Sequence, residues 1–293
     1  MKSGKNRMKT NVNKTIIILF ALLLSVCAYC ENFSFAMLDV GQGLNIVVIN
    51  DGKALIYDCG TSDFNNTNFE MNKYCFDNVT KPYLDKNNIK EIEYVVLSHP
   101  QTDHYIGFLN GLELFKVNNL FHNGRNSSNR NYKELVNLVS YKNIKCEQVF
   151  NGKKFRLGDA ECEVLGPFAN LDFKEPDENS VVLKITYNKK TFLLAGDISE
   201  KSEYYYVKNY GKALKSDVYV VAGHGTKYSS SQSFLDSVSP DYALISCGVN
   251  NQYHLPHPTL LKRLRNYNIL GTYMNGNVVF KVVNDKIEVV KDK

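Results

Sequence analysis

The chain has 293 residues, of which 44% are hydrophobic, and it carries 35 basic and 30 acidic residues. This length and composition exclude a disordered chain and suffice for one large domain or two small ones. The formal net charge of +5 is weak support for a nucleic-acid partner, because several of the basic residues lie within the first 14 positions.

The first 30 residues have the features of a targeting segment. Basic residues precede TIIILFALLLSVCAY, an uncharged apolar run. A run of this length suits the hydrophobic region of a signal peptide and is short for a membrane span. We expect residues 1–30 to be a signal peptide cleaved after Ala28, or an uncleaved N-terminal membrane anchor, and residues 31–293 to form one domain. Either alternative predicts export to the periplasm, the cell surface or the medium.

Short apolar strands separated by turn residues dominate the first part of that domain. Gly41, Gly43 and the pair Asp51-Gly52 are placed as in hairpin turns. A polar stretch over 62–78 is expected to be a surface loop. The expected elements are strands over 32–40, 45–50, 53–60 and 91–99, with helices over 79–89 and 132–143.

The rest of the chain repeats this order of strands followed by helices. We expect strands over 162–167, 180–188, 190–197, 217–224, 241–248, 271–275 and 277–283, with helices over 199–211, 231–238 and 258–268. Two successive strand-then-helix halves predict an α/β fold in which two sheets pack together with helices outside, layered αββα.

Five cysteines follow the targeting segment, without the C-x-x-C spacing of a structural zinc site. Export would permit a disulfide, for which Cys59 and Cys75 are the nearest pair in the sequence. An odd number of thiols cannot all pair within the chain.

Residues that can bind metal recur where the expected strands end. The segment VVLSHPQTDHYIG, Val95 to Gly107, follows an apolar strand and contains two histidines five positions apart. Side chains at adjacent strand ends can converge, because their loops lie on one rigid edge of a sheet. The candidates are Asp58, His99, Asp103, His104, Asp197, His224, His254 and His257.

Each candidate also has an ordinary structural explanation. The Gly196-Asp197 pair is typical of a turn, the His257-Pro258 pair is typical of a surface loop, and His104 alone could be a half-buried histidine. However, five of the six histidines lie in three strand-end loops that also carry aspartates or follow them closely. Scattered surface histidines seldom show this clustering, so the pattern favours a metal site.

Ordered motifs give the chain a resemblance to a known family. LSHPQTDHYIG resembles the H-x-H-x-D-H motif of the metallo-β-lactamase superfamily, in the form H-x-x-x-D-H. MLDVGQG, LIYDCG, NSVVLKITY, FLLAGDIS, GHGTKYSSS and NNQYHLPHP occur in the order found in the C-terminal hydrolase domain of ComEC competence proteins and their free-standing relatives. The similarity extends from Phe33 to the C-terminus. It implies the four-layer αββα sandwich of the metallo-β-lactamase fold for residues 31–293.

The resemblance further implies a hydrolase with a binuclear metal site. His99 would serve one ion, Asp103 and His104 would serve the other, and Asp197 would bridge both. Asp58 would support the motif loop through hydrogen bonds that orient a ligand.

The resemblance leaves the late histidine of the second site open, because His224 and His257 both occur in family motifs. Three positions depart from the family pattern. Leu44 replaces the acidic residue that often follows D-V-G-Q-G. Gln101 replaces the second histidine of the motif, which makes His122 a candidate for the missing ligand, and Gly223 replaces the first histidine of H-H-G-S. One tightly held ion and a second, weaker one would fit these changes.

The expected ligands indicate the chemistry. Imidazole and carboxylate together suit zinc, or manganese where nitrogen ligands are fewer. A bound divalent ion lowers the pKa of water from about 15.7 towards 7, which allows hydrolysis near neutral pH. The resemblance implies DNA or another phosphodiester as the substrate. Asp103, Asp58 and Lys227 are the expected catalytic residues, with Lys227 meeting a phosphate oxygen; the alternative is that Lys227 is a solvated loop lysine.

Two other functions stay open at this point. One is metal-dependent hydrolysis of a non-nucleic ester or thioester. The other is a degenerate metal-binding module without turnover, which the substitutions at Gln101 and Gly223 favour. Four retained residues oppose that alternative: His99, Asp103, His104 and Asp197.

Overall fold

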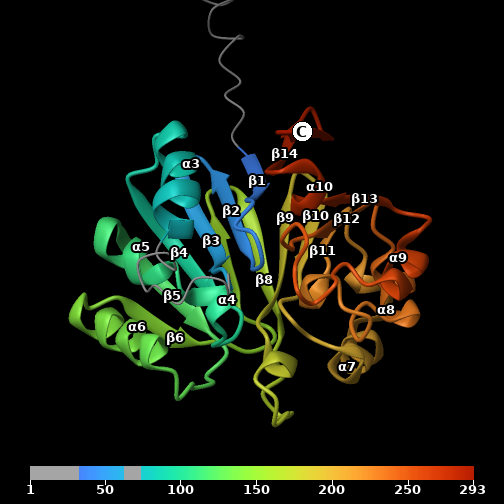
Figure 1. The fold of residues 1–293 in the computed structure, drawn as a ribbon, viewed down its shortest axis with the longest axis horizontal. Helices are drawn as coiled ribbons and strands as arrows, with labels where there is room; N and C mark the ends of the chain where they lie inside the picture. Colours follow the sequence, from blue (N-terminus) through green and yellow to red (C-terminus); the bar gives the residue numbers. More distant parts are fainter. Residues whose placement is uncertain (1–32, 63–73) are drawn as a thin grey trace, which may run out of the picture. The chain divides into compact units, whose positions relative to one another are not determined.

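Two β-sheets lie face to face in the structure, with helices on both outer sides (Figure 1). The computed structural model describes residues 33–62 and 74–293, so the expected targeting segment lies outside the described residues. The layered arrangement confirms the predicted four-layer αββα sandwich of an α/β fold.

Among the described residues, eight strands form the first sheet, in the order β15-β14-β1-β2-β3-β4-β5-β6. The pairs β3–β4, β4–β5 and β5–β6 are parallel, so these strands end at the same edge. The strands are β1 (Phe33–Met37), β2 (Asn45–Asn50), β3 (Lys53–Cys59), β4 (Glu91–Leu97), β5 (Lys116–His122), β6 (Lys145–Gln148), β14 (Val278–Val283) and β15 (Lys286–Lys291).

Within the same described part of the chain, seven strands form the second sheet, in the order β13-β12-β11-β10-β9-β8-β7. Strands β10 to β13 run parallel and again end at one edge. The strands are β7 (Lys154–Leu157), β8 (Ala160–Gly166), β9 (Val182–Tyr187), β10 (Lys190–Leu194), β11 (Val218–Val220), β12 (Tyr242–Ile245) and β13 (Asn268–Gly271).

Helices cover the outer face of each sheet (Figure 1). Those that follow strands of the first sheet are η1 (Phe76–Thr80), α3 (Lys81–Lys86), α4 (Thr102–Tyr105), α5 (Phe108–Leu114) and α6 (Arg130–Tyr141). Those in the second half are η2 (Asp177–Asn179), α7 (Glu200–Tyr210), η3 (Gly211–Leu214), η4 (Ala222–Gly225), α8 (Gln232–Val238), α9 (Pro258–Leu264) and α10 (Thr272–Asn275).

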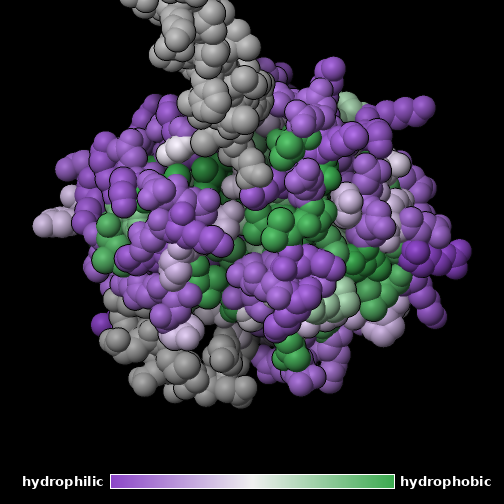
Figure 2. Space-filling view, turned by 90° about the horizontal axis from the view of Figure 1, so that it is seen from above, coloured by the Kyte–Doolittle hydropathy of each residue, from purple (hydrophilic) through white to green (hydrophobic). Residues whose placement is uncertain are grey.

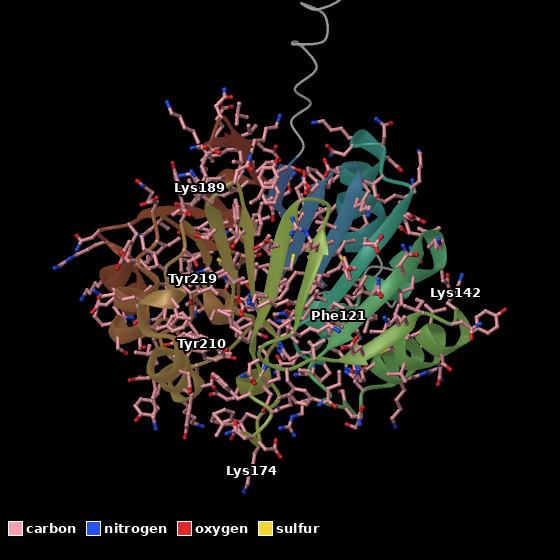
Figure 3. All side chains as sticks on the ribbon, turned by 180° about the vertical axis from the view of Figure 1, so that it is seen from behind. Phe121, Lys142, Lys174, Lys189, Tyr210 and Tyr219 are labelled. Atoms are coloured by element: carbon pink, nitrogen blue, oxygen red, sulfur yellow. The ribbon has the colours of Figure 1, made fainter. Side chains whose placement is uncertain are left out.

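Alternation along the strands builds three apolar layers. Phe35 of β1 and Phe192 of β10 stack between the sheets, with ring centroids 4.7 Å apart. The next residue on each strand, Ala36 or Leu193, points to the helix-covered side. Phe121 of β5 also belongs to the layer between the sheets (Figure 3). Because both faces are buried, these strands read as continuous apolar runs in the sequence.

The surface differs from this interior in hydropathy. Seen from above, hydrophilic residues cover much of the molecule and hydrophobic residues gather towards the middle of the view (Figure 2). Across residues 33–62 and 74–293, no helix is both long enough and apolar enough to cross a membrane.

The structure corrects some of the expected elements. A strand was expected over 271–275, but Gly271 ends β13 and residues 272–275 form the helical turn α10, in which the Asn275 side chain accepts a hydrogen bond from Gly271 N. The expected loop over 62–78 becomes helical from Tyr74 onward. Strands β5, β6, β7, β13 and β15 were not anticipated from the sequence, and the helix expected over 258–268 ends at Leu264 as α9.

The nearest cysteine pair packs as two buried thiols. A hydrogen bond to the Cys59 thiol, together with burial, raises the pKa of Cys75 well above its usual value. The same two sulfur atoms lie where a side chain at Gly107 would begin, 2.5 and 2.7 Å from the Cβ position. The pair therefore requires glycine at this point, directly before α5.

Candidate metal centre

Histidine and aspartate side chains converge at the ends of strands from both sheets. The turn between β9 and β10, at Lys189, lies near one end of the molecule, and Lys174 lies near the other (Figure 3). The cluster lies at the far end of β10 from that turn. Among the described residues, two groups each bring three potential ligand atoms within 4.8 Å of one another. The first group is His99, His104 and Asp197, and the second group is Asp103, His104 and His224.

His104 belongs to both groups, and its ring orientation is fixed by Asp58. The ring Nδ1 lies 2.7 Å from Asp58 Oδ2, and Asp58 Oδ1 accepts the backbone N–H of Ser98 at 2.7 Å. An ionised carboxylate only accepts, so Nδ1 carries a hydrogen and Nε2 is the atom left to bind a metal ion. Nε2 faces Asp197, whose Oδ2 lies 3.4 Å away.

His224 presents its Nε2 to the same point from the opposite side. Its Nδ1 donates to the carbonyl oxygen of Ser246 at 3.0 Å, which leaves Nε2 without a hydrogen. The Nε2 atoms of His104 and His224 lie 3.1 Å apart. Two nitrogen ligands of a tetrahedral zinc ion lie about 3.3 Å apart, given zinc–nitrogen distances of about 2.0–2.1 Å. The two rings therefore fit a shared divalent ion.

The carboxylates give the cluster negative charge, which suits a cation. Burial alone would lower the pKa of His104, but the carboxylates of Asp197 and Asp58 outweigh burial and raise that pKa well above its usual value. When no ion is bound, the ring therefore holds a second proton on Nε2, which a metal ion would displace. Burial would raise the pKa of Asp197, yet the rings of His104 and His224 hold it below its usual range. Asp103 Oδ2 lies 3.5 Å from His224 Nε2 and adds another carboxylate.

His99 and Asp197 each direct an unused polar atom into the cluster. His99 is fully buried, its Nδ1 lies 2.9 Å from Ser98 Oγ, and its Nε2 has no hydrogen-bond partner. Burial, followed by the neighbouring His104 charge, lowers the pKa of His99 to about 3. Asp197 Oδ1 is also buried without a partner. Buried polar atoms are normally paired, so these two atoms indicate a bound ion.

The MLDVGQG turn braces the loop that carries Asp103. A side chain at Gly43 would meet Gly60 O at 2.2 Å, and one at Gly60 would meet the Asp103 carbonyl carbon at 2.2 Å. The Leu44 N–H donates to Asp103 O at 3.0 Å. Gly43 also connects the two sheets, because its carbonyl accepts from Ser246 Oγ at 2.7 Å. The glycines of this motif therefore allow a close backbone approach behind the ligands.

Two residues of the cluster adopt left-handed backbone conformations. Asp58 has φ 55° and His224 has φ 54°. Such conformations cost about 1–3 kcal/mol at non-glycine residues and persist where the surrounding structure enforces them. Gly223 has φ 60°, and a side chain there would meet Thr226 Cγ2 at 2.7 Å. A larger residue at Gly223 would therefore be strained and would crowd Thr226 in this loop.

Three residues near the cluster were missed by the sequence analysis. Ser98 contacts both motif histidines, and Ser180 Oγ lies 3.4 Å from His99 Nδ1. Asp177 Oδ1 lies 3.8 Å from His99 Nε2 and accepts a hydrogen bond from the Gln101 side chain. Burial, with the negative charge of Asp197, raises the pKa of Asp177 to about 6. The sequence could have indicated Asp177 and Ser180 as site residues, because both come directly before the strand β9.

The other predicted site residues lie outside both groups. The His257 ring caps α9 by accepting from Thr259 N at 3.1 Å, and the half-buried His122 ring accepts from Gly124 N at 3.1 Å. Lys227 is exposed, with its Nζ 5.0 Å from the centroid of the Tyr228 ring.

A buried glutamate anchors the loop that follows His224. Glu203 of α7 is fully buried and accepts the backbone N–H groups of Ser230 at 2.5 Å and Ser231 at 2.8 Å. We expect Glu203→Ala to lower the free energy of unfolding by about 2–4 kcal/mol, because each buried unpaired group costs about 1–3 kcal/mol. Urea denaturation measures this. Glu200→Ala, an exposed change on the same helix, should cost less than about 1 kcal/mol; equal losses would contradict the anchoring role.

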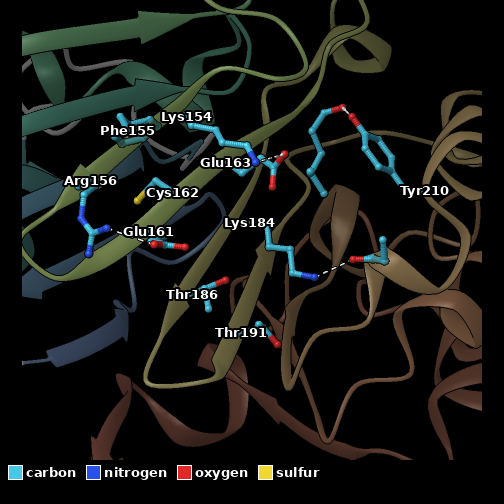
Figure 4. A pocket seen from close by; sticks show the side chains of 12 residues that line it. Lys154, Phe155, Arg156, Glu161, Cys162, Glu163, Lys184, Thr186, Thr191 and Tyr210 are labelled. Atoms are coloured by element: carbon cyan, nitrogen blue, oxygen red, sulfur yellow. Dashed lines mark hydrogen bonds and ion pairs between the residues drawn. The ribbon is translucent and has the colours of Figure 1, made fainter.

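A cavity of about 590 Å³ lies apart from this cluster, along β7 to β10 and beside α7 (Figure 4). Its charged side chains already have partners. Arg156 pairs with Glu161 at 3.1 Å, and Lys184 donates to two backbone carbonyls at 2.7 Å each. Charges satisfied within the chain leave little to bind a charged ligand here, whereas the strand-end cluster holds buried polar atoms without partners.

The sequence model of the metallo-beta-lactamase superfamily matches residues 38–249, a range that contains every member of the two groups. The chain belongs to the metallo-β-lactamase superfamily. The arrangement of histidine and aspartate at the strand ends is accordingly the metal-binding arrangement of this fold.

Two curated relatives match nearly the whole of this chain. The chain is 28% identical over 276 residues to "Recombination protein 2" of Haemophilus influenzae, covering 94% of this chain and 32% of that protein. It is 28% identical over 275 residues to "ComE operon protein 3" of Bacillus subtilis, covering 91% of this chain and 35% of that protein. The chain thus spans about a third of the length of these relatives, which confirms the ComEC-like resemblance over that part.

Solved structures share the fold at low sequence identity. Igni18, titled a metallo hydrolase from Ignicoccus hospitalis, has a TM-score of 0.53 and 13% identity, covering 84% of this chain and 98% of that chain. CmlA, titled a diiron beta-hydroxylase from Streptomyces venezuelae, has a TM-score of 0.51 and 12% identity, covering 86% of this chain and 54% of that chain. Because the two titles name different reactions, the shared fold does not decide the chemistry.

Proposed function

We propose that the chain is an exported, metal-dependent hydrolase that cleaves phosphodiester bonds, with DNA as the substrate. The observation that carries this proposal is the convergence of the Nε2 atoms of His104 and His224, 3.1 Å apart, beside the carboxylate of Asp197. This donor set suits zinc, with manganese as the alternative.

Each residue has a distinct part in the proposed site. Asp103, His104 and His224 would hold one ion, His99 would hold the other, and Asp197 would lie between them. When bound, a divalent ion lowers the pKa of water and stabilises negative charge on the attacked phosphate.

The groups behind these ligands keep the lone pairs aimed at the ions. Asp58 holds the hydrogen of His104 on Nδ1, and the Ser246 carbonyl does the same for His224. Such hydrogen bonds raise the basicity of a ligand and fix its orientation. The site is therefore pre-organised before a substrate arrives.

The substrate is inferred from the relatives and from the loops around the site. Their names refer to recombination and to competence, and another relative, of Neisseria gonorrhoeae, is named "Competence protein ComA". Such names favour DNA over a non-nucleic ester or thioester. The apolar run before Tyr29 supports export, with residues 1–30 as the signal peptide or anchor.

Cleavage of DNA by the purified full-length chain tests the proposal. Metal is removed by chelation, and zinc, manganese or magnesium is restored before single- and double-stranded DNA are added, beside the Asp103→Ala variant. We expect cleavage that needs both an ion and Asp103. Bound metal without DNA cleavage would redirect the search to esters and thioesters, and absence of metal binding would leave a binding module without turnover.

Lys227 provides a narrower test of the DNA substrate. It is exposed on the loop after His224, so its ammonium group can reach a phosphate. We expect Lys227→Ala to raise KM several-fold and to reduce the dependence of log affinity on log salt by about 0.7–0.9, as for one lost phosphate contact. The control is Lys142→Ala, on the flank of the molecule (Figure 3). Equal salt dependence in both variants would show that Lys227 does not contact a DNA phosphate.

A further inference from the structure

The position around His99 lacks a nitrogen ligand that the superfamily motif normally provides. Gln101 occupies that point of the loop, and its amide nitrogen donates to Asp177 Oδ1. The amide is thus engaged by a carboxylate from another part of the chain. The same Asp177 Oδ1 lies 3.8 Å from His99 Nε2, within ion-pair distance.

The turn that carries Asp177 is held in place beside the cluster. Ser180 donates to the Asp177 carbonyl oxygen through its backbone N–H at 2.9 Å and through its Oγ at 2.6 Å. The same Oγ accepts from Asp197 N at 3.2 Å and contacts His99 Nδ1 at 3.4 Å. Ser180 therefore joins the Asp177 turn to two residues of the first group.

Neighbouring side chains fix the other end of this turn. Glu178 is buried and accepts from Ser199 N at 3.1 Å and Ser202 Oγ at 2.6 Å. Asn179 donates to the Phe173 carbonyl at 2.8 Å. The Asp177 side chain, which is 38% exposed, is therefore the part of the turn that can approach an ion.

We propose that Asp177 supplies the ligand that Gln101 does not, so that the first position consists of His99, Asp177 and Asp197. The inference rests on the metal centre of the proposed function. Two ligand atoms of one ion lie about 3–4 Å apart at metal–ligand distances of about 2.0–2.2 Å, which matches the 3.8 Å between His99 Nε2 and Asp177 Oδ1. The unpartnered, fully buried Nε2 of His99 points to the same ion.

The ligand set determines which ion each position prefers. One imidazole with two carboxylates is an oxygen-rich set, which suits manganese or magnesium. The second position, with His104 and His224, has two nitrogen ligands and suits zinc. The chain therefore has two unequal positions, and Gln101 acts as a positioning residue that holds the Asp177 carboxylate towards the first.

Manganese binding to the full-length chain tests this assignment without relying on activity. The zinc content is measured by mass spectrometry, and free manganese is followed by electron paramagnetic resonance during titration of the zinc-loaded protein. We expect the wild type to hold one zinc and one manganese. Asp177→Asn, which keeps the shape of the side chain, should weaken manganese binding at least tenfold and leave the zinc in place.

Two further variants make the test specific. Glu175→Gln alters an exposed carboxylate two residues earlier and should leave manganese binding unchanged. Gln101→His should restore a nitrogen ligand and raise zinc affinity at the first position at least tenfold. Unchanged manganese binding in Asp177→Asn would overturn the assignment of Asp177. Zinc bound by the wild type in the same experiment would still support the metal centre of the proposed function. A wild type that binds no metal would refute the proposed function and this inference together.

Discussion

Replacement of Asp197 by alanine is expected to reduce turnover by about 10³-fold. Asp197 Oδ2 lies within 3.6 Å of the Nε2 atoms of His104 and His224, and its Oδ1 is buried without a partner. It is therefore the carboxylate on which both ion positions depend. Ions of this kind contribute several kcal/mol of charge stabilisation, and each 1.4 kcal/mol corresponds to about tenfold in rate.

The fold should survive this change, because Asp197 lies at a strand end and outside the three apolar layers. Far-UV circular dichroism and metal content, measured beside the rate, separate loss of the site from loss of structure. Asp236→Ala, an exposed aspartate on α8, is the control and should keep full activity. Full activity in Asp197→Ala would refute the site.

The second large effect is expected from Asp58→Asn, a change that removes one charge and almost no volume. The asparagine oxygen can still accept from Ser98 N, but its amide nitrogen then faces His104 Nδ1 as a donor. The His104 hydrogen must move to Nε2, where it blocks coordination. We expect zinc affinity to fall about 10- to 100-fold, as measured by competition with a chelator.

The same substitution at an exposed turn gives the control for Asp58→Asn. Asp51 precedes β3 and has φ 52°, a conformation that asparagine also tolerates. Asp51→Asn should leave zinc affinity and unfolding free energy within error of the wild type. Equal zinc affinity in both variants would mean that Asp58 does not set the ring orientation of His104.

The sequence predicted the layers and the strands that carry the site, for a physical reason. Strands buried on both faces, such as β3 and β10, are continuous apolar runs that end abruptly at Asp58 and shortly before Asp197. Edge strands such as β6, β7 and β15 have solvent on one side and mix charged with apolar residues. Their pattern resembles that of loops, so they were not anticipated.

The sequence could not predict where the candidate side chains point. His122 ends a parallel strand of the first sheet, yet its ring turns back to Gly124 N. His257 stands in a family motif, yet its ring caps the start of α9. Asp177 comes close to His99 only because a short turn folds over the sheet edge. The contacts of His122 and His257 are local, whereas that of Asp177 joins distant parts of the chain. In all three cases the side-chain direction depends on how the loop packs, which the residue pattern does not encode.

Anomalous diffraction from crystals of the full-length chain, grown with zinc and with manganese, tests the metal centre most directly. The account predicts a zinc peak about 2.0–2.1 Å from the Nε2 atoms of both His104 and His224. Crystals in which the ion binds elsewhere, or in which these two rings bind none, would contradict it.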